Sequence, residues 1–106
     1  MWRFSLGYTS KLDANNIIVF FNMTSLTRKN TCIIVVTFNP STEFTRNVSR
    51  YLEIADKVII VDNNSAINVA ALVPTNIDVN KVVFINSEVN NGIAWGLNQG
   101  LTKAIF

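Results

Sequence analysis

The chain has 106 residues, of which 49% are hydrophobic and 15% are charged, a composition that fits one folded domain and excludes a disordered chain. It contains one cysteine and no histidine, which excludes an intramolecular disulfide and any catalytic or metal site built on histidine. Nine lysines and arginines against seven aspartates and glutamates give a net charge of +2, scattered along the chain, so the sequence favours no nucleic-acid partner.

The first 22 residues show no regular pattern except an apolar run at 17–21 that is compatible with a strand. They lack the apolar core and the small-residue cleavage site of a signal peptide. No apolar stretch approaches the ~20 residues of a membrane-spanning helix, so we expect a soluble protein without a transmembrane segment. Met23 and the short polar segment after it are typical of a natural start. We therefore expect residues 1–22 to be an extension of unclear role and residues 23–106 to form the domain.

The first organised segment is a continuous apolar run that begins at Cys32. Because this run is apolar on both faces, it predicts a buried parallel strand over about 32–38. Cys32 itself is best interpreted as a small buried hydrophobe, since no basic partner is evident. The apolar residues that follow have the spacing of an amphipathic helix, and they are Phe44, Val48, Tyr51, Leu52 and Ala55.

The same strand signature returns at 57–62 and at 81–86. Between these strands we expect a short helix over 67–72 that ends before Pro74, and after them a last helix over about 91–106. The order is then β-α-β-α-β-α, and the spacing of the strands fits right-handed parallel crossovers. This predicts an α/β fold with a Rossmann-like parallel sheet, strands in the spatial order 3-2-1 and helices on the faces.

The last helix has two stripes at a spacing of four residues. Gly92, Gly96 and Gly100 form one of them, which indicates close packing on the sheet or the close approach of a ligand. The other stripe is apolar and is expected in the core, and it consists of Ile93, Leu97, Leu101 and Ile105.

Ligands of such sheets bind beyond the carboxyl ends of the strands, which here are the segments 37–39, 62–65 and 86–92. None of these turns carries a dinucleotide-binding or P-loop glycine motif, so a nucleotide would be recognised by its base and sugar. Asp62 ends a rigid strand and is placed to accept a hydrogen bond from an imide N–H or a ribose hydroxyl, unless it caps the turn after it. Thr37 and Asn39 either line the same pocket or belong to an ordinary turn.

Three blocks of sequence carry a resemblance to a known family, and they are VVTFNP at 35–40, VDNNS at 61–65 and NNGIAWGLNQG at 90–100. Together they resemble the opening of family 2 glycosyltransferases of the GT-A fold. The third block is most similar to the bacterial rhamnosyltransferase branch, although Gly96 stands where that branch usually has alanine. The resemblance covers about 31–106.

The resemblance implies that this part of the domain holds the nucleotide of a dTDP- or UDP-sugar. The complete enzyme would transfer a rhamnose-like sugar to a saccharide or lipid-linked saccharide acceptor. By the same resemblance the Asp62 carboxylate accepts the N3–H of uracil or thymine. The substrate-binding residues expected in this chain are Thr37, Asn39, Asp62, Asn63, Asn90 and Gly92.

The family also has an Asp-x-Asp motif that holds Mg²⁺ or Mn²⁺ against the diphosphate, and an acidic general base. This chain contains no Asp-x-Asp, so we expect no catalytic or metal-binding residue in it and no transfer activity by it alone. The expectation is a truncated donor-binding fragment of an enzyme of bacterial polysaccharide biosynthesis, located in the cytoplasm or at the inner face of the membrane. The alternative is a non-catalytic α/β nucleotide-binding or interaction domain. The sequence encoded after Phe106 would discriminate, because a strand ending in Asp-x-Asp supports the enzyme.

Overall fold

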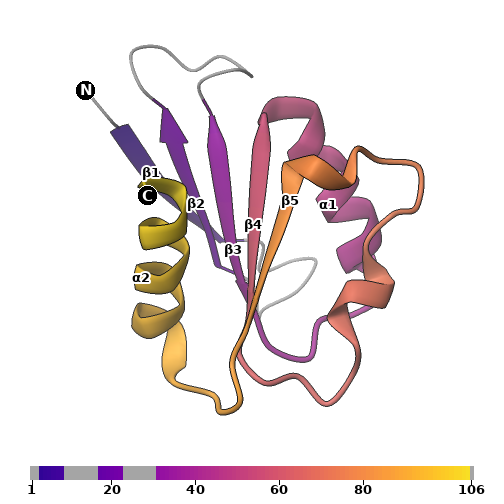
Figure 1. Cartoon of the computed structure of the whole chain (residues 1–106), viewed down its shortest axis with the longest axis vertical. Helices are drawn as coiled ribbons and strands as arrows, with labels where there is room; N and C mark the ends of the chain where they lie inside the picture. Colours follow the sequence, from indigo (N-terminus) through magenta and orange to yellow (C-terminus); the bar gives the residue numbers. More distant parts are fainter. Residues whose placement is uncertain (1–2, 9–16, 23–30, 106) are drawn as a thin grey trace.

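The computed structural model describes residues 3–8, 17–22 and 31–105, which form one mixed sheet with a long helix on each face (Figure 1). The sheet has five strands in the order β1-β2-β3-β4-β5. The elements in chain order are β1 (Arg3–Tyr8), β2 (Ile17–Asn22), β3 (Cys32–Thr37), α1 (Glu43–Ile54), β4 (Lys57–Asp62), η2 (Val69–Leu72), η3 (Val79–Lys81), β5 (Val82–Asn86) and α2 (Gly92–Ile105).

The three strands predicted from the apolar runs are confirmed as β3, β4 and β5. They are neighbours in the expected order, and both pairings are parallel. Thr37 is aligned with Asp62, and Asp62 is aligned with Asn86, so the three strands end at the same level of the sheet. This shared end is where the candidate site is built.

The described fold differs from the sequence prediction in two respects. The sheet is mixed, because β1 and β2 form an antiparallel pair and β2 runs antiparallel to β3. The strand expected at 17–21 is thereby confirmed, while the role of residues 1–22 stays a prediction. The short helix predicted at 67–72 is present as a 3-10 helix at 69–72 and not as an α-helix, and a second 3-10 helix, η3, precedes β5. Pro74 has no backbone N–H, so it could not continue a helix beyond Val73.

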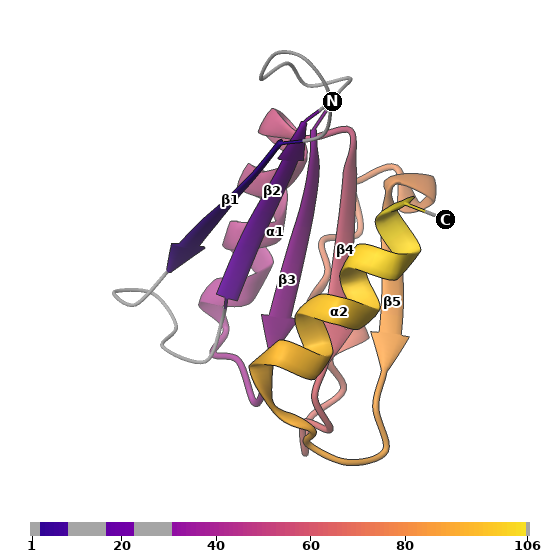
Figure 2. The ribbon, with the colours of Figure 1, turned by 90° about the vertical axis from the view of Figure 1, so that its left-hand side faces the viewer.

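The two long helices lie on opposite faces of the sheet (Figure 2). The core consists of two clusters of buried side chains, one on each of these faces. Alternate residues of a strand point to opposite faces, so Ile33 and Val35 pack toward α1 while Ile34 and Val36 pack toward α2. All four of these side chains are at most 2% exposed. We call the two groups the α1-side cluster and the α2-side cluster.

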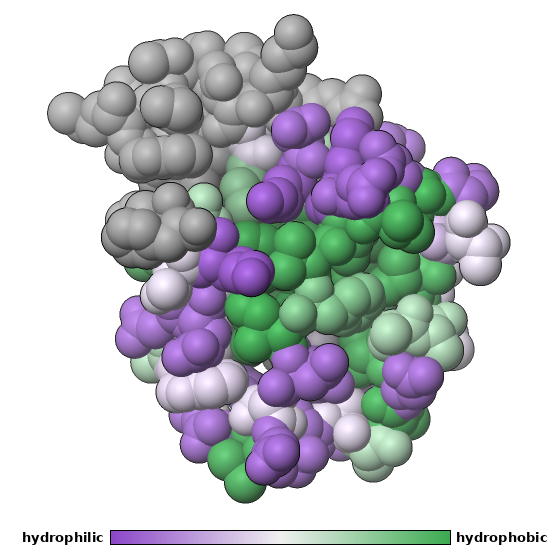
Figure 3. Space-filling view, viewed as in Figure 1, coloured by the Kyte–Doolittle hydropathy of each residue, from purple (hydrophilic) through white to green (hydrophobic). Residues whose placement is uncertain are grey.

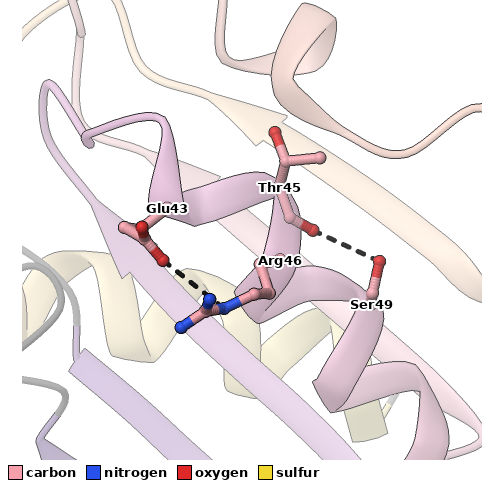
Figure 4. A network of polar contacts seen from close by, with 4 residues as sticks. All are labelled: Glu43, Thr45, Arg46 and Ser49. Atoms are coloured by element: carbon pink, nitrogen blue, oxygen red, sulfur yellow. Dashed lines mark hydrogen bonds and ion pairs between the residues drawn. The ribbon is translucent and has the colours of Figure 1, made fainter.

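The amphipathic helix predicted after the first parallel strand is confirmed as α1. Its whole apolar stripe is buried, namely Phe44, Val48, Tyr51, Leu52 and Ala55. Its outer surface carries an ion pair of 3.5 Å between Arg46 Nε and Glu43 Oε2 and a 3.3 Å bond from Ser49 Oγ to the Thr45 carbonyl (Figure 4). The Arg46 side chain is 59% exposed and the Glu43 side chain 44%, so water screens this pair and it contributes little to stability.

The glycines of α2 let this helix lie directly on β3. A Cβ atom at Gly96 would stand 2.6 Å from Val36 Cγ1, and one at Gly100 would collide with Ile34. Close packing on the sheet therefore explains these two positions. One turn earlier, Gly92 has nothing within 4 Å of the corresponding point, because the first turn of α2 extends past the end of the strand.

The prediction that Ile93 belongs to the core is wrong, since its side chain is 49% exposed. It lies in the same first turn, beyond the part of the sheet that Leu97 and Leu101 contact, and the Ile105 side chain lies outside the described residues. Leu97 and Leu101 do pack against the α2-side cluster. Within the part of the chain that the structure describes, no helix combines the length and the apolar character needed to span a bilayer.

Candidate functional site

The candidate site lies at the common end of the three parallel strands, where the N-terminus of α2 also lies (Figures 1 and 2). A cavity of about 320 Å³ opens there between the end of β3, the loop after β4 and the first turn of α2. Its lining residues are Val36, Thr37, Phe38, Asn63, Asn90, Gly92 and Ile93. Four of the six predicted substrate-binding residues are among them, and none of these described lining residues is charged.

Asn63 connects the three elements that form the cavity. Its backbone N–H donates to the Thr37 carbonyl at 2.9 Å, which extends the pairing of β3 and β4 by one residue. Its side-chain Nδ2 donates to the Gly92 carbonyl at 3.0 Å. The residue is 3% exposed, and its Oδ1 atom is buried without a hydrogen-bond partner among the described residues.

Thr37 is a second lining residue that has a buried polar atom without a described partner. The residue is fully buried at the end of β3, and its Oγ1 has no hydrogen-bond partner in the described part of the chain. A buried polar atom without a partner costs about 1–3 kcal/mol, so two of them beside one cavity are an unusual feature of a folded domain.

Asp62 is buried, and its contacts are those of a turn cap. Its Oδ1 accepts hydrogen bonds from the Ser65 backbone N–H at 3.0 Å and from the Ser65 hydroxyl at 2.6 Å. Its carbonyl accepts from the Ser87 N–H at 2.9 Å. The described lining of the cavity includes neither Asp62 nor Asn39. The turn-cap alternative is therefore observed, and the contact between Asp62 and a base stays a prediction.

Asn39 is tied to the loop after β4 and lies near Asp62, as expected. Its backbone N–H donates to Ser65 Oγ at 2.8 Å, and its Oδ1 accepts from the Ala66 N–H at 2.7 Å. It has a φ of 47°, a conformation that asparagine tolerates better than most residues. Ser65, which sequence reasoning did not select, thus joins Asp62 to Asn39. Only its position three residues after Asp62 pointed to a cap.

Asn90 and Gly92 shape the first turn of α2. Asn90 Oδ1 accepts the Gly92 N–H at 2.9 Å, which fixes the turn that leads into α2. Gly92 has a φ of +85°, which a residue with a side chain adopts only under strain. This backbone conformation presents the Gly92 carbonyl to Asn63. Sequence reasoning did not select Phe38 or Ile93 as lining residues, although Phe38 lies within the predicted segment 37–39.

Three comparisons with known proteins complete the description of the site. Neither the family models, nor the curated proteins, nor the solved structures include a match to this chain. The similarity of the three sequence blocks to family 2 glycosyltransferases therefore enters below only as a proposal.

Proposed function

We propose that the chain is the donor-binding part of a glycosyltransferase, and that the cavity beyond β3 and β4 receives the base of a nucleotide-diphosphate sugar. The observation that carries this proposal is that Thr37, Asn63, Asn90 and Gly92 line one cavity. These residues come from three separate sequence blocks, the same three that carry the resemblance to family 2 glycosyltransferases. The donor is a dTDP- or UDP-sugar, and the acceptor is a saccharide or lipid-linked saccharide.

The chemistry of the cavity supports a neutral polar group more than a phosphate. Its polar lining consists of a hydroxyl, amides and backbone groups, and Phe38 adds an aromatic side chain. The Mg²⁺ or Mn²⁺ implied by the resemblance does not fit these residues, because the described lining of the cavity holds no carboxylate and Asp62 Oδ1 is bonded to Ser65. We therefore derive no step through a metal. A location in the bacterial cytoplasm or at the inner face of the membrane belongs to the same proposal.

A titration with UDP and dTDP, followed by NMR, tests this function. We expect weak binding, with Kd near ~1 mM, equivalent to about −4 kcal/mol, because the diphosphate has no metal-bound contacts. The amide signals of Asn63, Gly92 and Ile93 should shift, whereas pyrophosphate alone at the same concentration should leave them in place. Shifts confined to residues far from this cavity, such as those of η3, would refute the proposal.

The second candidate function is a non-catalytic interaction domain, which one observation favours. All four apolar residues of β5 are only half-buried, and together they give the molecule an apolar surface on that side (Figure 3). Sedimentation velocity over a wide concentration range tests this candidate. A sedimentation coefficient that rises with concentration while UDP fails to bind would favour an interaction domain.

A further inference from the structure

β5 has one edge that no strand of the described chain covers. Its other edge is paired with β4 in an uninterrupted parallel register. Edge strands of folded proteins are usually protected by a charged residue, a proline or a bulge. The sequence of β5, VVFIN, contains neither a charged residue nor a proline, and its apolar residues are only half-buried. Nothing within β5 therefore hinders the addition of another strand.

The pairing with β4 determines which backbone groups of β5 lie at the free edge. The Ser87 N–H donates to the Asp62 carbonyl at 2.9 Å, so the backbone groups of Ser87 face β4. Successive residues of a strand direct their N–H and C=O groups to opposite sides, so those of Phe84 and Asn86 point away from β4. The Val82 carbonyl points the same way, whereas the Val82 N–H donates to the Val79 carbonyl.

These free groups are self-complementary about Phe84. When a second copy of the chain lies antiparallel with its Phe84 opposite this one, each Phe84 N–H donates to the Phe84 carbonyl of the other copy. Each Asn86 N–H then donates to the Val82 carbonyl of the other copy. The same register sets the half-buried Val83 and Ile85 opposite each other on the α2 side of the sheet.

The charges near the two ends of β5 favour the same orientation. Lys81 precedes the strand and Glu88 follows it, and Glu88 forms no ion pair in the described part of the chain. Antiparallel pairing brings Lys81 of one copy close to Glu88 of the other. Parallel pairing would instead bring like charges together, which disfavours it.

The surface around β5 leaves room for a second copy. Apolar side chains occupy the middle of the view over β5 in Figure 3. α2 packs mainly on β3 and β4, and a cavity of about 460 Å³ lies between α2 and β5. Its described lining is Phe84, Ile85, Gln99, Thr102 and Lys103. The Val83 side chain of a second copy, opposite Ile85, would lie at this cavity.

We propose that the chain forms a two-fold symmetric dimer in which the β5 strands of two copies pair antiparallel about Phe84. The sheet then continues from one copy into the other. This inference rests on the interaction surface of the second candidate function, and it does not depend on whether the cavity beyond β3 binds a nucleotide. The contact is a single pair of strands, so the dimer should be weak and should dissociate on dilution.

Hydrogen exchange followed by NMR tests the proposal on the full chain. Sedimentation velocity first establishes a dilute concentration with monomer and a high concentration with mostly dimer. The N–H groups of Phe84 and Asn86 should exchange about fivefold or more slowly at the high concentration, because they become hydrogen-bonded only in the dimer. The N–H groups of Val83 and Ile85 face β4 in the monomer already, so their exchange should change less than about twofold.

Substitutions of two exposed asparagines test the location of the contact. Asn86 lies next to Lys81 of the other copy in the proposed dimer, so Asn86→Lys should raise the dissociation constant about threefold or more. Asn86→Glu should leave the dissociation constant unchanged or lower it. The matched control is Asn98→Lys on α2, which adds the same charge and should change the dissociation constant less than about twofold. Hydrogen exchange of the unchanged chain decides the question even where a variant fails to fold.

The outcomes separate this inference from the candidate function on which it rests. If the chain associates while Phe84 and Asn86 exchange equally fast at both concentrations, the contact lies elsewhere. The inference is then wrong, and the interaction domain stands. The same holds if Asn98→Lys weakens the association as much as Asn86→Lys. A chain that stays monomeric at every concentration would overturn the inference and leave the edge of β5 to a different partner.

Discussion

β4 and β5 have similar amino-acid sequences, but their side chains are buried to very different extents in the structure. Each contains four consecutive apolar residues, and both runs predict a buried parallel strand. The four residues at 58–61 of β4 are completely buried, whereas those at 82–85 of β5 are only half-buried. β4 lies between β3 and β5, while β5 has a single sheet neighbour among the described residues. A buried apolar run thus identifies a strand, but the pairing decides how much of it is buried.

The same contrast appears at the surface. In Figure 3 an apolar area occupies the middle of the view, over β5 and between the two layers of helices. Phe84 packs against the α1-side cluster and Ile85 packs against the α2-side cluster. Each of these side chains is only partly buried, with one side against the core and the other toward the surface. β3 is not an edge strand of the sheet, because β2 pairs with it along five residues. The predictions below use this difference between interior and edge strands.

Removal of residues 1–22 should have the largest effect, because it turns β3 into an edge strand. Each backbone hydrogen bond contributes about 0.5–1.5 kcal/mol, and the ladder from Ile17 to Phe21 would be lost together with the cover over β3. We expect the free energy of unfolding to fall by several kcal/mol in urea denaturation. The sequence of residues 1–22 shows no regular pattern, which alone would predict that their removal leaves the free energy of unfolding nearly unchanged. A loss below ~1 kcal/mol would show that it is dispensable.

Two isoleucines on the same face of the sheet measure the difference between interior and edge directly. Ile59 of β4 is fully buried, and Ile85 of β5 is partly buried against the same α2-side cluster. Ile59→Ala should cost about 2–5 kcal/mol, and Ile85→Ala about half of that, since less area is removed from contact. Chemical denaturation of both variants checks the ratio. Equal costs would mean that β5 is covered as fully as β4.

A smaller effect is expected where α2 lies on β3. Gly96→Ala places a Cβ 2.6 Å from Val36 Cγ1, and overpacking of this kind costs about 1–3 kcal/mol. Alanine also gains about 1 kcal/mol of helix propensity, so the net loss should be near ~1 kcal/mol in thermal denaturation. The control is Asn98→Ala on the exposed side of the same helix, which should be neutral or slightly stabilising. A gain in stability from Gly96→Ala would contradict the close approach.

The sequence predicts the local elements of this fold well because their patterns are local. Consecutive β-branched residues define β3, β4 and β5, and the spacing of Phe44 and Val48 defines the buried face of α1. The antiparallel partner β2 could not be placed, since strand pairing is a long-range property. Ile93 fits the apolar stripe of α2 and is still exposed, because the sheet ends before that turn of the helix.

The candidate site likewise combines features that the local sequence predicts with contacts that only the folded chain determines. The ends of the strands indicate where a cavity lies, and the resemblance to family 2 glycosyltransferases selects Thr37, Asn63, Asn90 and Gly92 among its residues. The use of Asp62 Oδ1 by Ser65, and of Ser65 by Asn39, depends on how two distant loops meet. No spacing in the sequence indicates that the Asn63 amide turns its nitrogen to Gly92. These contacts exist only after the chain has folded, and they decide which polar atoms remain available.

Cys32 is the buried first residue of the interior strand β3. The last prediction concerns its thiol and has the smallest effect at neutral pH. Burial raises the pKa of the Cys32 thiol to about 11, and the nearby Lys57 charge lowers it only in part. The thiol stays protonated at pH 8, so alkylation by iodoacetamide should be about 100-fold slower in the folded than in the unfolded chain. The raised pKa leaves stability unaffected below the unfolded value near ~8.5 and lowers it as the pH rises toward 11. Cys32→Ala should remove that part of the alkaline loss, and equal alkylation rates in both states would place Cys32 outside the core.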